Sequence, residues 1–251
     1  MSSSRRLRAV ITNDDGIDSP GLWVLAAAAR DAGFEVTVAA PHVDTSGAGA
    51  SVLAVRDDDG HVRVHRRDRD GITGYAVEGH PAFIALSVAR GWLGPPDVLL
   101  SGINLGTNTG RAVLHSGTVG AALTAGLAGI RALAVSQATG WPPSPNPRWD
   151  TAASVVPGVL DSLLAAPEGT VLSLNVPDLP ADELGPLREA ALAPAGAVQV
   201  RVTEGDGLLR TEYAGSGPVA EDTDVALLAA GHPTVTSLTA ITAVPGLFTS
   251  L

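Results

Sequence analysis

Short apolar runs alternate with longer alanine-rich segments along the first part of the chain. Leu7–Thr12 has the length and apolar character of a buried strand, and Glu35–Ala40 is a second such run, rich in β-branched residues. Between them lies a predicted helix that Ser19 caps, Pro20 begins and Gly33 ends. A strand, a helix and a strand in this order form a βαβ unit, so we expect parallel strands with a right-handed crossover.

The same alternation resumes beyond residue 80. It predicts helices at Pro81–Leu93, Val119–Ala128, Thr151–Ala165 and Asp224–Gly231, and strands at Asp97–Leu100, Ala132–Ser136, Val171–Val176 and Thr234–Leu238. Two segments have the pattern of antiparallel pairs instead: residues 51–77, around the turn Asp57–Gly60, and residues 197–213, around Glu204–Gly207. We therefore expect residues 1–251 to form one α/β domain with a mainly parallel sheet and an antiparallel insertion. The C-terminal hairpin extension is expected to occupy about residues 196–217.

The composition supports a layered protein and excludes several kinds of chemistry. Hydrophobic residues make up 45% of the chain but aromatic residues only 4%, so the core must consist mainly of Ala, Val, Leu and Ile. The absence of cysteine excludes disulfides, thiolate metal sites and a cysteine nucleophile. All 16 basic residues are arginine, which excludes Schiff-base chemistry and the lysine of a P-loop. A phosphate site in this chain must therefore use arginine, backbone N–H groups, hydroxyls or a metal.

The charge and the N-terminal sequence limit the expected partners. The formal net charge of -10 opposes binding to a nucleic-acid polymer, and the arginines of residues 63–69 are diluted by Asp68 and Asp70. The polar start Met1–Arg8 is not followed by a signal-peptide segment, and no apolar run approaches the roughly 20 residues of a membrane span. We expect a cytoplasmic protein without a membrane partner.

Three polar segments follow predicted strands, where the loops of a parallel sheet converge on one crevice. They are Asn13–Gly16, His42–Ser51 and Ser101–Gly110. In the first, the adjacent carboxylates of Asp14 and Asp15 would repel each other strongly in a cleft unless a cation compensates them. Oxygen ligands favour Mg²⁺, Mn²⁺ or Ca²⁺, so these segments predict a divalent metal site. Taken alone, Asp-Asp-Gly is also an ordinary turn sequence.

A fourth segment, His115–Thr118, directly precedes the predicted helix at Val119–Ala128. Backbone N–H groups at a helix N-terminus, with two hydroxyls and a glycine that permits close approach, form an anion site without a lysine. Taken singly, Ser and Thr at this position more commonly cap the helix. A metal and an anion site in one crevice imply phosphoryl chemistry, in which the metal polarises a phosphoryl oxygen and activates a water for in-line attack.

Several short motifs occur in a fixed order along the chain. The first is Thr12–Gly16 with Ser19-Pro20-Gly21, followed by Ala40-Pro41 with Ser46-Gly47, by Ser101–Asn104 with Gly106, Asn108 and Gly110, and by Ser116–Val119 with Ala121-Ala122. Asn175-Val176-Pro177 and Thr223-Asp224, with Leu227 and Gly231, extend the set toward the C-terminus. With these motifs the chain resembles the SurE survival-protein family over nearly its whole length.

The resemblance implies a three-layer, Rossmann-like fold and a phosphatase of nucleoside 5′- and 3′-monophosphates that uses one divalent metal ion, Mg²⁺ or Mn²⁺. By resemblance, the metal ligands are Asp14, Asp15, Ser46 and Asn104. The same resemblance places Asn13, Gly47, Asn108, Ser116, Gly117 and Thr118 around the substrate phosphate, with Asn13 catalytic beside the two aspartates. It also implies a homodimer or homotetramer that exchanges C-terminal elements, for which the hairpin at residues 197–213 is the candidate.

Several positions depart from the pattern of the family in the walls of the crevice, while the inferred ligands are retained. Val43 and Thr45 stand where the second loop of the family has arginines, and His80 and Phe83 replace a threonine and an aspartate. Arg111, Ala112 and His115 replace an acidic pair and an aromatic residue before Ser-Gly-Thr. Phosphomonoester hydrolysis is therefore better supported than a preference for nucleotides. The alternatives are the same chemistry on another phosphorylated metabolite, and a SurE-like protein that binds such a metabolite without hydrolysing it.

Histidines and tryptophans near these loops have two interpretations each. One of His42, His80 and His115 could protonate the leaving group, or all three could be loop residues without a catalytic duty. Trp141 and Trp149, with the prolines between them, could form a lid over a base or ring, or could pack on the surface.

Overall fold

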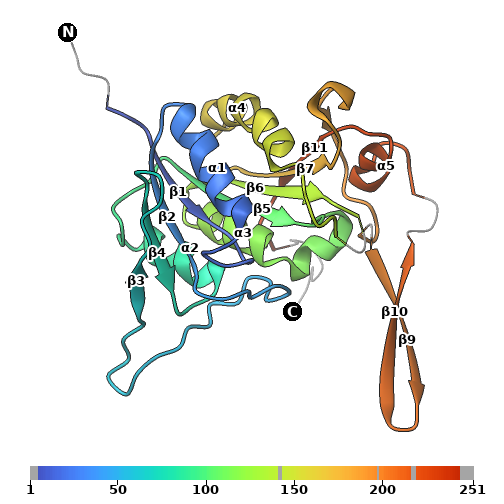
Figure 1. The fold of residues 1–251 in the computed structure, drawn as a ribbon, viewed down its shortest axis with the longest axis horizontal. Helices are drawn as coiled ribbons and strands as arrows, with labels where there is room; N and C mark the ends of the chain where they lie inside the picture. The colour runs from blue at the N-terminus through green and yellow to red at the C-terminus, as the bar shows by residue number, and fades with distance from the viewer. Residues whose placement is uncertain (1–4, 141–142, 197, 216–218, 244–251) are drawn as a thin grey trace, which may run out of the picture.

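Parallel strands form the centre of the molecule. The computed structural model describes residues 5–140, 143–196, 198–215 and 219–243, and these contain a nine-stranded sheet in the order β3-β4-β2-β1-β5-β6-β7-β11-β8 (Figure 1). Its strands are β1 (Arg8–Thr12), β2 (Glu35–Pro41), β3 (Val64–Arg66), β4 (Thr73–Val77), β5 (Val98–Leu105), β6 (Arg131–Ala138), β7 (Val171–Pro177), β8 (Arg188–Glu189) and β11 (Thr234–Leu238). From β4 to β7 the strands are parallel, whereas β3 and β11 run antiparallel to β4 and β7. The mainly parallel sheet predicted from the sequence is confirmed.

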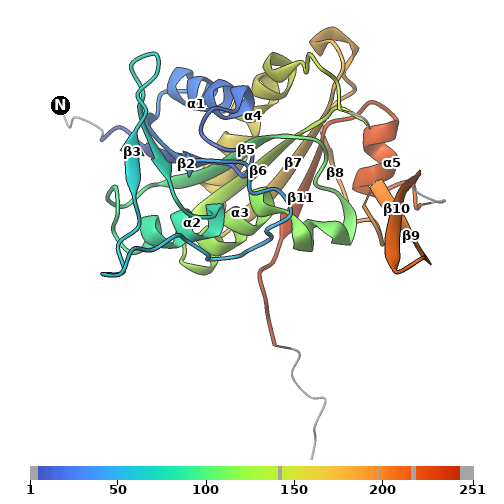
Figure 2. The same cartoon turned by 60° about the horizontal axis from the view of Figure 1, so that its bottom comes forward.

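Helices cover both faces of this sheet, as Figure 2 shows. α1 (Pro20–Asp31) and α4 (Trp149–Ala165) pack on one face, and α2 (Pro81–Ala89) and α3 (Gly117–Leu127) pack on the other. Leucine, isoleucine and valine side chains predominate in the layer under α1 and α4, whereas small alanines predominate under α3. The three-layer α/β architecture is thus confirmed. In the part of the chain that the structure describes, no helix is long and apolar enough to cross a bilayer.

Two predicted features of the helices were wrong. α2 ends at Ala89 instead of Leu93, because Gly91 and Leu93 have φ values of 102° and 66°, which lie outside the helical region. Ser19 occupies the N-cap position of α1, but its side chain forms no capping hydrogen bond. Pro20 at the first helical position already lacks one of the N–H groups that a cap would satisfy.

The insertion between β2 and α2 differs in part from the prediction. The tight turn is confirmed, because the N–H of Asp57 donates to the carbonyl of His61 at 3.0 Å and that of Gly60 to Asp57 at 2.9 Å. The antiparallel pair β3–β4 lies farther along the chain, and β4 also pairs in parallel with β2. The insertion therefore adds two strands to the main sheet, β4 beside β2 and β3 beyond it. Two 3₁₀ helices, η1 (Gly110–His115) and η2 (Ala181–Glu183), were not predicted.

The C-terminal hairpin is confirmed. β9 (Val198–Gly205) and β10 (Leu208–Gly215) form a separate two-stranded antiparallel sheet that projects away from the main sheet in Figure 1. Asp206 and Gly207, at its turn, have φ values of 54° and 73°, the positive values that a type I′ hairpin turn requires. The short helix α5 (Asp224–Ala229) follows the hairpin and leads into β11. Residues 197, 216 and 217 of the predicted hairpin range lie outside the described residues.

Candidate metal and phosphate site

The predicted site residues lie where the strand order of the sheet changes direction. β1 lies between β2 and β5; the chain passes from β1 to β2 and later returns on the other side of β1 with β5. The loops that follow such a pair diverge and leave a crevice at the carboxyl ends of the strands. Asp14 and Asp15 directly follow β1, and Asn104 is the penultimate residue of β5. The strand ends therefore bring two of the predicted segments together.

Asn104 lies within a strand, whereas the sequence predicted a loop there. β5 continues beyond Leu100, because its pairing with β6 is irregular after Ser101 and resumes between Asn104 and Ser136. Gly102, inside the irregular part, has a φ of 136°, and a Cβ on it would lie 2.2 Å from the carbonyl oxygen of Val135. The sheet thus determines the position of Asn104 more firmly than a loop would.

Of the acidic pair, Asp14 is buried and Asp15 is half-buried, and neither has a basic partner among the described residues. Asp14 is 3% exposed, and burial raises the pKa of its carboxyl group, although the hydroxyl of Thr118 donates to Oδ1 and opposes that shift. Burial and the charge of Asp14 raise the pKa of Asp15 to about 7, while the N–H of Leu105 donates to Oδ2 of Asp15 at 3.2 Å. Among the described residues, no arginine or histidine forms an ion pair with either carboxylate. Such a pair favours a bound cation.

Side-chain oxygen atoms from two other segments lie next to the hydroxyl of Thr118. Oγ1 of Thr118 donates to Asp14 and lies 3.2 Å from Oδ1 of Asn104. Nδ2 of Asn104 donates to the carbonyl of Gly106 at 2.9 Å, which leaves Oδ1 on the side of Thr118. The described ranges contain no cluster of three or more His, Cys, Asp or Glu side chains that could hold a metal. A metal at Asp14 and Asp15 would therefore take its other ligands from hydroxyl, amide or water oxygens.

The first turn of α3 packs directly against Asp14. Oγ of Ser116 accepts the N–H of Val119 at 3.1 Å, so the capping interpretation is confirmed for this serine. A Cβ on Gly117 would lie 2.7 Å from Oδ2 and 2.8 Å from Cβ of Asp14. Glycine is the one residue without such an atom, and it lets the positively polarised start of the helix approach the carboxylate.

The loop after β2 reaches the site through its backbone. The N–H of Thr45 donates to the carbonyl of Asp14 at 2.8 Å, and the N–H of Gly49 donates to the last carbonyl of η1 at 3.2 Å. Ser46 and Gly47 lie between these two anchors and are exposed. Over the described part of the chain, the hydroxyl of Ser46 makes no hydrogen bond with the acidic pair. The structure thus places this loop beside Asp14 without a hydrogen bond from the Ser46 side chain to the acidic pair.

The side-chain amides of two predicted site residues, Asn13 and Asn108, form hydrogen bonds in the turn after β1 and the loop after β5. Asn13 is fully buried; its Nδ2 donates to the carbonyl of Gly16 at 3.1 Å, and its Oδ1 has no partner among the described residues. Nδ2 of Asn108 donates to Oγ of Ser136 at 2.9 Å. These bonds stabilise the turn after β1 and the loop after β5, and neither amide is hydrogen-bonded to Asp14.

Two buried residues that belong to the sequence motifs but were given no role also hold the loop after β5. Asn175 accepts the N–H of Asn108 through Oδ1 and donates to its carbonyl through Nδ2, both at 2.9 Å. Asp224 accepts the N–H of Gly110 at 2.6 Å. A polar residue within the apolar run Val171–Val176 was the available signal for Asn175. For Asp224 the available signal was its place in the motif Thr223-Asp224.

Within the described residues, the three histidines and Trp149 are less closely involved in the candidate site than the aspartates and amides named above. His42 and His115 are exposed and His80 is half-buried, so a catalytic duty for any of them stays a prediction. Trp149 is the first residue of α4 and packs against the core under α1. The lid interpretation is therefore wrong for Trp149, and Trp141 lies outside the described residues.

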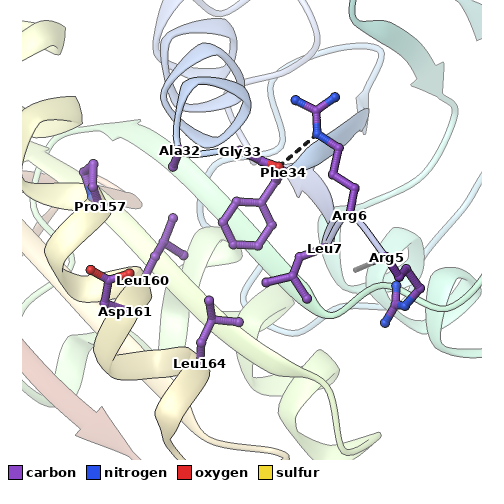
Figure 3. Close-up of a pocket in the computed structure, with 10 residues that line it drawn as sticks. All are labelled: Arg5, Arg6, Leu7, Ala32, Gly33, Phe34, Pro157, Leu160, Asp161 and Leu164. Atoms are coloured by element: carbon purple, nitrogen blue, oxygen red, sulfur yellow. Dashed lines mark hydrogen bonds between the residues drawn. The ribbon is translucent and has the colours of Figure 1, made fainter. Parts of the chain in front are cut away.

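A separate cavity of about 480 Å³ lies at the opposite end of the strands, before the first residues of β1 and β2 (Figure 3). Leu7, Phe34, Leu160 and Leu164 supply apolar walls, and α4 closes one side. Nε of Arg6, at its rim, donates to the carbonyl of Gly33 at 2.9 Å. None of the predicted site residues lines this cavity, so it is distinct from the crevice that holds the acidic pair.

Comparisons with known proteins agree with this geometry. Residues 9–197 match the family model described as "Survival protein SurE". The chain is 35% identical to a 5'-nucleotidase SurE of Synechococcus sp. (strain RCC307), and the match covers 92% of this chain and 88% of that protein. A 5'-nucleotidase SurE of Rhodopseudomonas palustris (strain BisB18) is 33% identical over 92% of this chain and 93% of its own. The crystal structure of the SurE protein from Aquifex aeolicus superimposes with a TM-score of 0.73 at 28% identity, over 92% of both chains.

Proposed function

This chain belongs to the SurE family, and we propose that it is a metal-dependent phosphatase that hydrolyses nucleoside 5′- and 3′-monophosphates. The observation that supports this most directly is the buried Asp14 beside the first turn of α3, with the half-buried Asp15 next to it in the chain. A helix N-terminus attracts a phosphate, and a cation between that phosphate and the carboxylates would join the two halves of the site. The names of the two relatives support the choice of nucleotides as substrates.

The residues present fit a divalent metal ion. Burial and the charge of Asp14 raise the pKa of Asp15 to about 7, and a bound cation would compensate the negative charge of the pair. We assign Asp14, Asp15, Ser46 and Asn104 as its ligands and Mg²⁺ or Mn²⁺ as the ion, because all four residues offer oxygen atoms. Once bound, the ion would polarise the phosphoryl group and make a water molecule more acidic.

The chain itself supplies the groups that orient the phosphate. In this proposal, backbone N–H groups of Gly117 and Thr118 donate to phosphate oxygens from the start of α3. The hydroxyl of Thr118 holds Asp14 in place, and the cap formed by Ser116 fixes the helix start. Gly47, exposed and with a φ of 80°, presents its backbone from the loop after β2.

Two further residues complete the proposed phosphate site. Asn108 binds the phosphate from the loop after β5, and Asn13 maintains the turn that carries the two aspartates. Neither role needs a lysine, which the chain lacks.

The rim of the crevice is also compatible with a second substrate class. Val43 is 52% exposed in the loop after β2, and Arg111 is exposed in η1. An apolar and a cationic side chain at these places suit a phosphorylated metabolite other than a nucleotide equally well. The non-catalytic alternative is disfavoured because the chain retains all four inferred ligands.

Metal removal is the first test. We expect EDTA to lower phosphate release by at least ~100-fold, and Mg²⁺ or Mn²⁺ to restore it, because the ion supplies most of the charge stabilisation in the site. The assay uses nucleoside 5′- and 3′-monophosphates, sugar phosphates and an aryl phosphate. Activity that survives EDTA would contradict the metal mechanism. Hydrolysis of sugar phosphates alone would favour the second substrate class, and hydrolysis of none would favour a binding protein.

We also propose that the chain forms a homodimer or homotetramer in which the hairpin at residues 198–215 is exchanged between subunits. Support comes from Val202, Leu208 and Leu209, apolar hairpin side chains that are 56%, 72% and 71% exposed. Surfaces of this kind mark contacts with another chain.

The double variant Leu208→Asp with Leu209→Asp is expected to have a lower molar mass in solution than the wild type, measured by size-exclusion chromatography with light scattering. Leu127→Asp, an equally exposed leucine on α3, is the control; equal masses for all three proteins would contradict the exchange.

A further inference from the structure

Asp224 is distant in sequence from the candidate site but is hydrogen-bonded to one of its loops. Its side chain is buried, with 1% of its surface exposed. Oδ2 accepts the N–H of Gly110 at 2.6 Å, and Oδ1 accepts the N–H groups of Ala193 at 3.0 Å and Val225 at 2.8 Å. A carboxylate that accepts three backbone N–H groups is fixed in orientation and fixes its donors in turn.

Gly110 connects the two segments that form the candidate phosphate site. It follows Asn108 by two residues and begins η1, which ends directly before Ser116. Its φ is 59°, and a Cβ at this position would lie 2.2 Å from the carbonyl oxygen of Ala195. The backbone at Gly110 is therefore tightly confined, and the bond to Asp224 determines the path of the chain from Asn108 to Ser116.

The second contact of Asp224 closes the base of the hairpin. Ala193 precedes β9 and Asp224 follows β10, so their hydrogen bond joins the two ends of this excursion. The same ends are joined by the N–H of Ala191, which donates to the carbonyl of Asp222 at 3.1 Å, and by the N–H of Asp224, which donates to Ala191 at 2.9 Å. The N–H of Arg111 donates to the carbonyl of Ala193 at 3.0 Å. Hydrogen bonds thus link the segments on either side of the hairpin, residues 191–193 and 222–224, to the start of η1.

We propose that Asp224 is a positioning residue that keeps residues 108–116 in the phosphate-binding conformation and couples this conformation to the base of the 198–215 hairpin. Its effect on hydrolysis rests on the proposed function, whereas its effect on residues 108–116 can be measured without a substrate. Without the carboxylate, the N–H groups of Gly110 and Ala193 lose their acceptor, and other conformations of the segment become populated. Substrate then binds only to the fraction of molecules with the segment in place, so KM rises while kcat changes little.

Asp224→Asn is the test variant, and Asp222→Asn is the matched control because Asp222 is exposed and undergoes the same chemical change two residues away. With a nucleoside monophosphate and saturating Mn²⁺, we expect Asp224→Asn to raise KM about tenfold and to change kcat less than about threefold. Hydrogen–deuterium exchange of the substrate-free proteins is the second measurement. Peptides covering residues 105–116 are expected to exchange faster in Asp224→Asn than in the wild type and in Asp222→Asn, while peptides of β1 and β6 stay unchanged.

Equal exchange at residues 105–116 in the two variants would overturn the proposal. Faster exchange over every peptide would also overturn it, because that is the result of a general loss of stability. In an active enzyme, faster local exchange with an unchanged KM would overturn the role in phosphate binding. If the wild type hydrolyses no phosphomonoester, the proposed function fails and the exchange measurement alone decides the positioning role. If Asp224→Asn does not fold, Asp224→Glu, which displaces the carboxylate by one methylene, replaces it in both measurements.

Discussion

Asp14→Asn is expected to lower kcat for phosphomonoester hydrolysis by about a thousandfold or more, because it removes one of the two carboxylates that would hold the metal. Its size and shape are kept, and an amide oxygen can still accept the hydrogen bond from Thr118. The measurement is phosphate release at saturating Mg²⁺ or Mn²⁺. A fall of less than about tenfold would contradict a role for Asp14 in holding the ion.

The same substitution is expected to stabilise the folded state of the metal-free protein. Burial and the charge of Asp14 raise the pKa of Asp15 to about 7, above its unfolded value. The folded state therefore favours the neutral acid, and this stability is present at low pH and is lost as the pH rises through 7. At pH 8 the removal of the Asp14 charge is expected to stabilise metal-free protein by about 1 kcal/mol. Thermal melting in EDTA measures it, with Asp18→Asn, an exposed acid of the same loop, as the control.

Gly117→Ala is expected to lower kcat/KM by roughly 10–100-fold, because an ångström-scale displacement of a metal ligand has effects of this size. The added Cβ would lie 2.7 Å from Oδ2 of Asp14, so either the carboxylate or the start of α3 must move. Gly117 lies in the first turn of a helix, where alanine is otherwise favourable. Loss of activity in a protein that still folds is therefore the expected result.

Gly158→Ala is the matched control for this substitution. Gly158 also lies in a helix, α4, and a Cβ there would have no neighbour within 4 Å. It is expected to keep full activity and to raise the melting temperature slightly, because alanine is the better helix former. Equal activity for the two variants would mean that the close approach of α3 to Asp14 has no part in the chemistry.

Local signals explain why so much of the fold could be predicted. The βαβ unit at the start depends on apolar runs and on Pro20 and Gly33, which act within a few residues of their own positions. The end of β5 depends instead on pairing between Asn104 and Ser136 of a neighbouring strand, and no pattern near Leu100 encodes that pairing. The parallel pairing of β4 with β2 was missed for the same reason.

In the candidate site, too, some residues could be identified from local sequence and others could not. Asp14 and Gly117 could be identified because their residue types are unusual for their positions, and the structure brings them into contact. Asn175 and Asp224 could not be assigned a role, because each acts on backbone groups of residues 67 and 114 positions away. A backbone N–H is the same for almost every residue, so the sequence contains no complementary signal for such a contact.

Mn²⁺ binding tests the central claim, that Asp14 and Asp15 hold a divalent ion, most directly. Metal-free protein is titrated with Mn²⁺, and the free ion is measured by its electron paramagnetic resonance signal. One Mn²⁺ per chain is expected to bind to the wild type and to Asp18→Asn, with at least ~100-fold weaker binding to Asp14→Asn. Binding of Mn²⁺ to Asp14→Asn with the stoichiometry and affinity of the wild type would contradict the account.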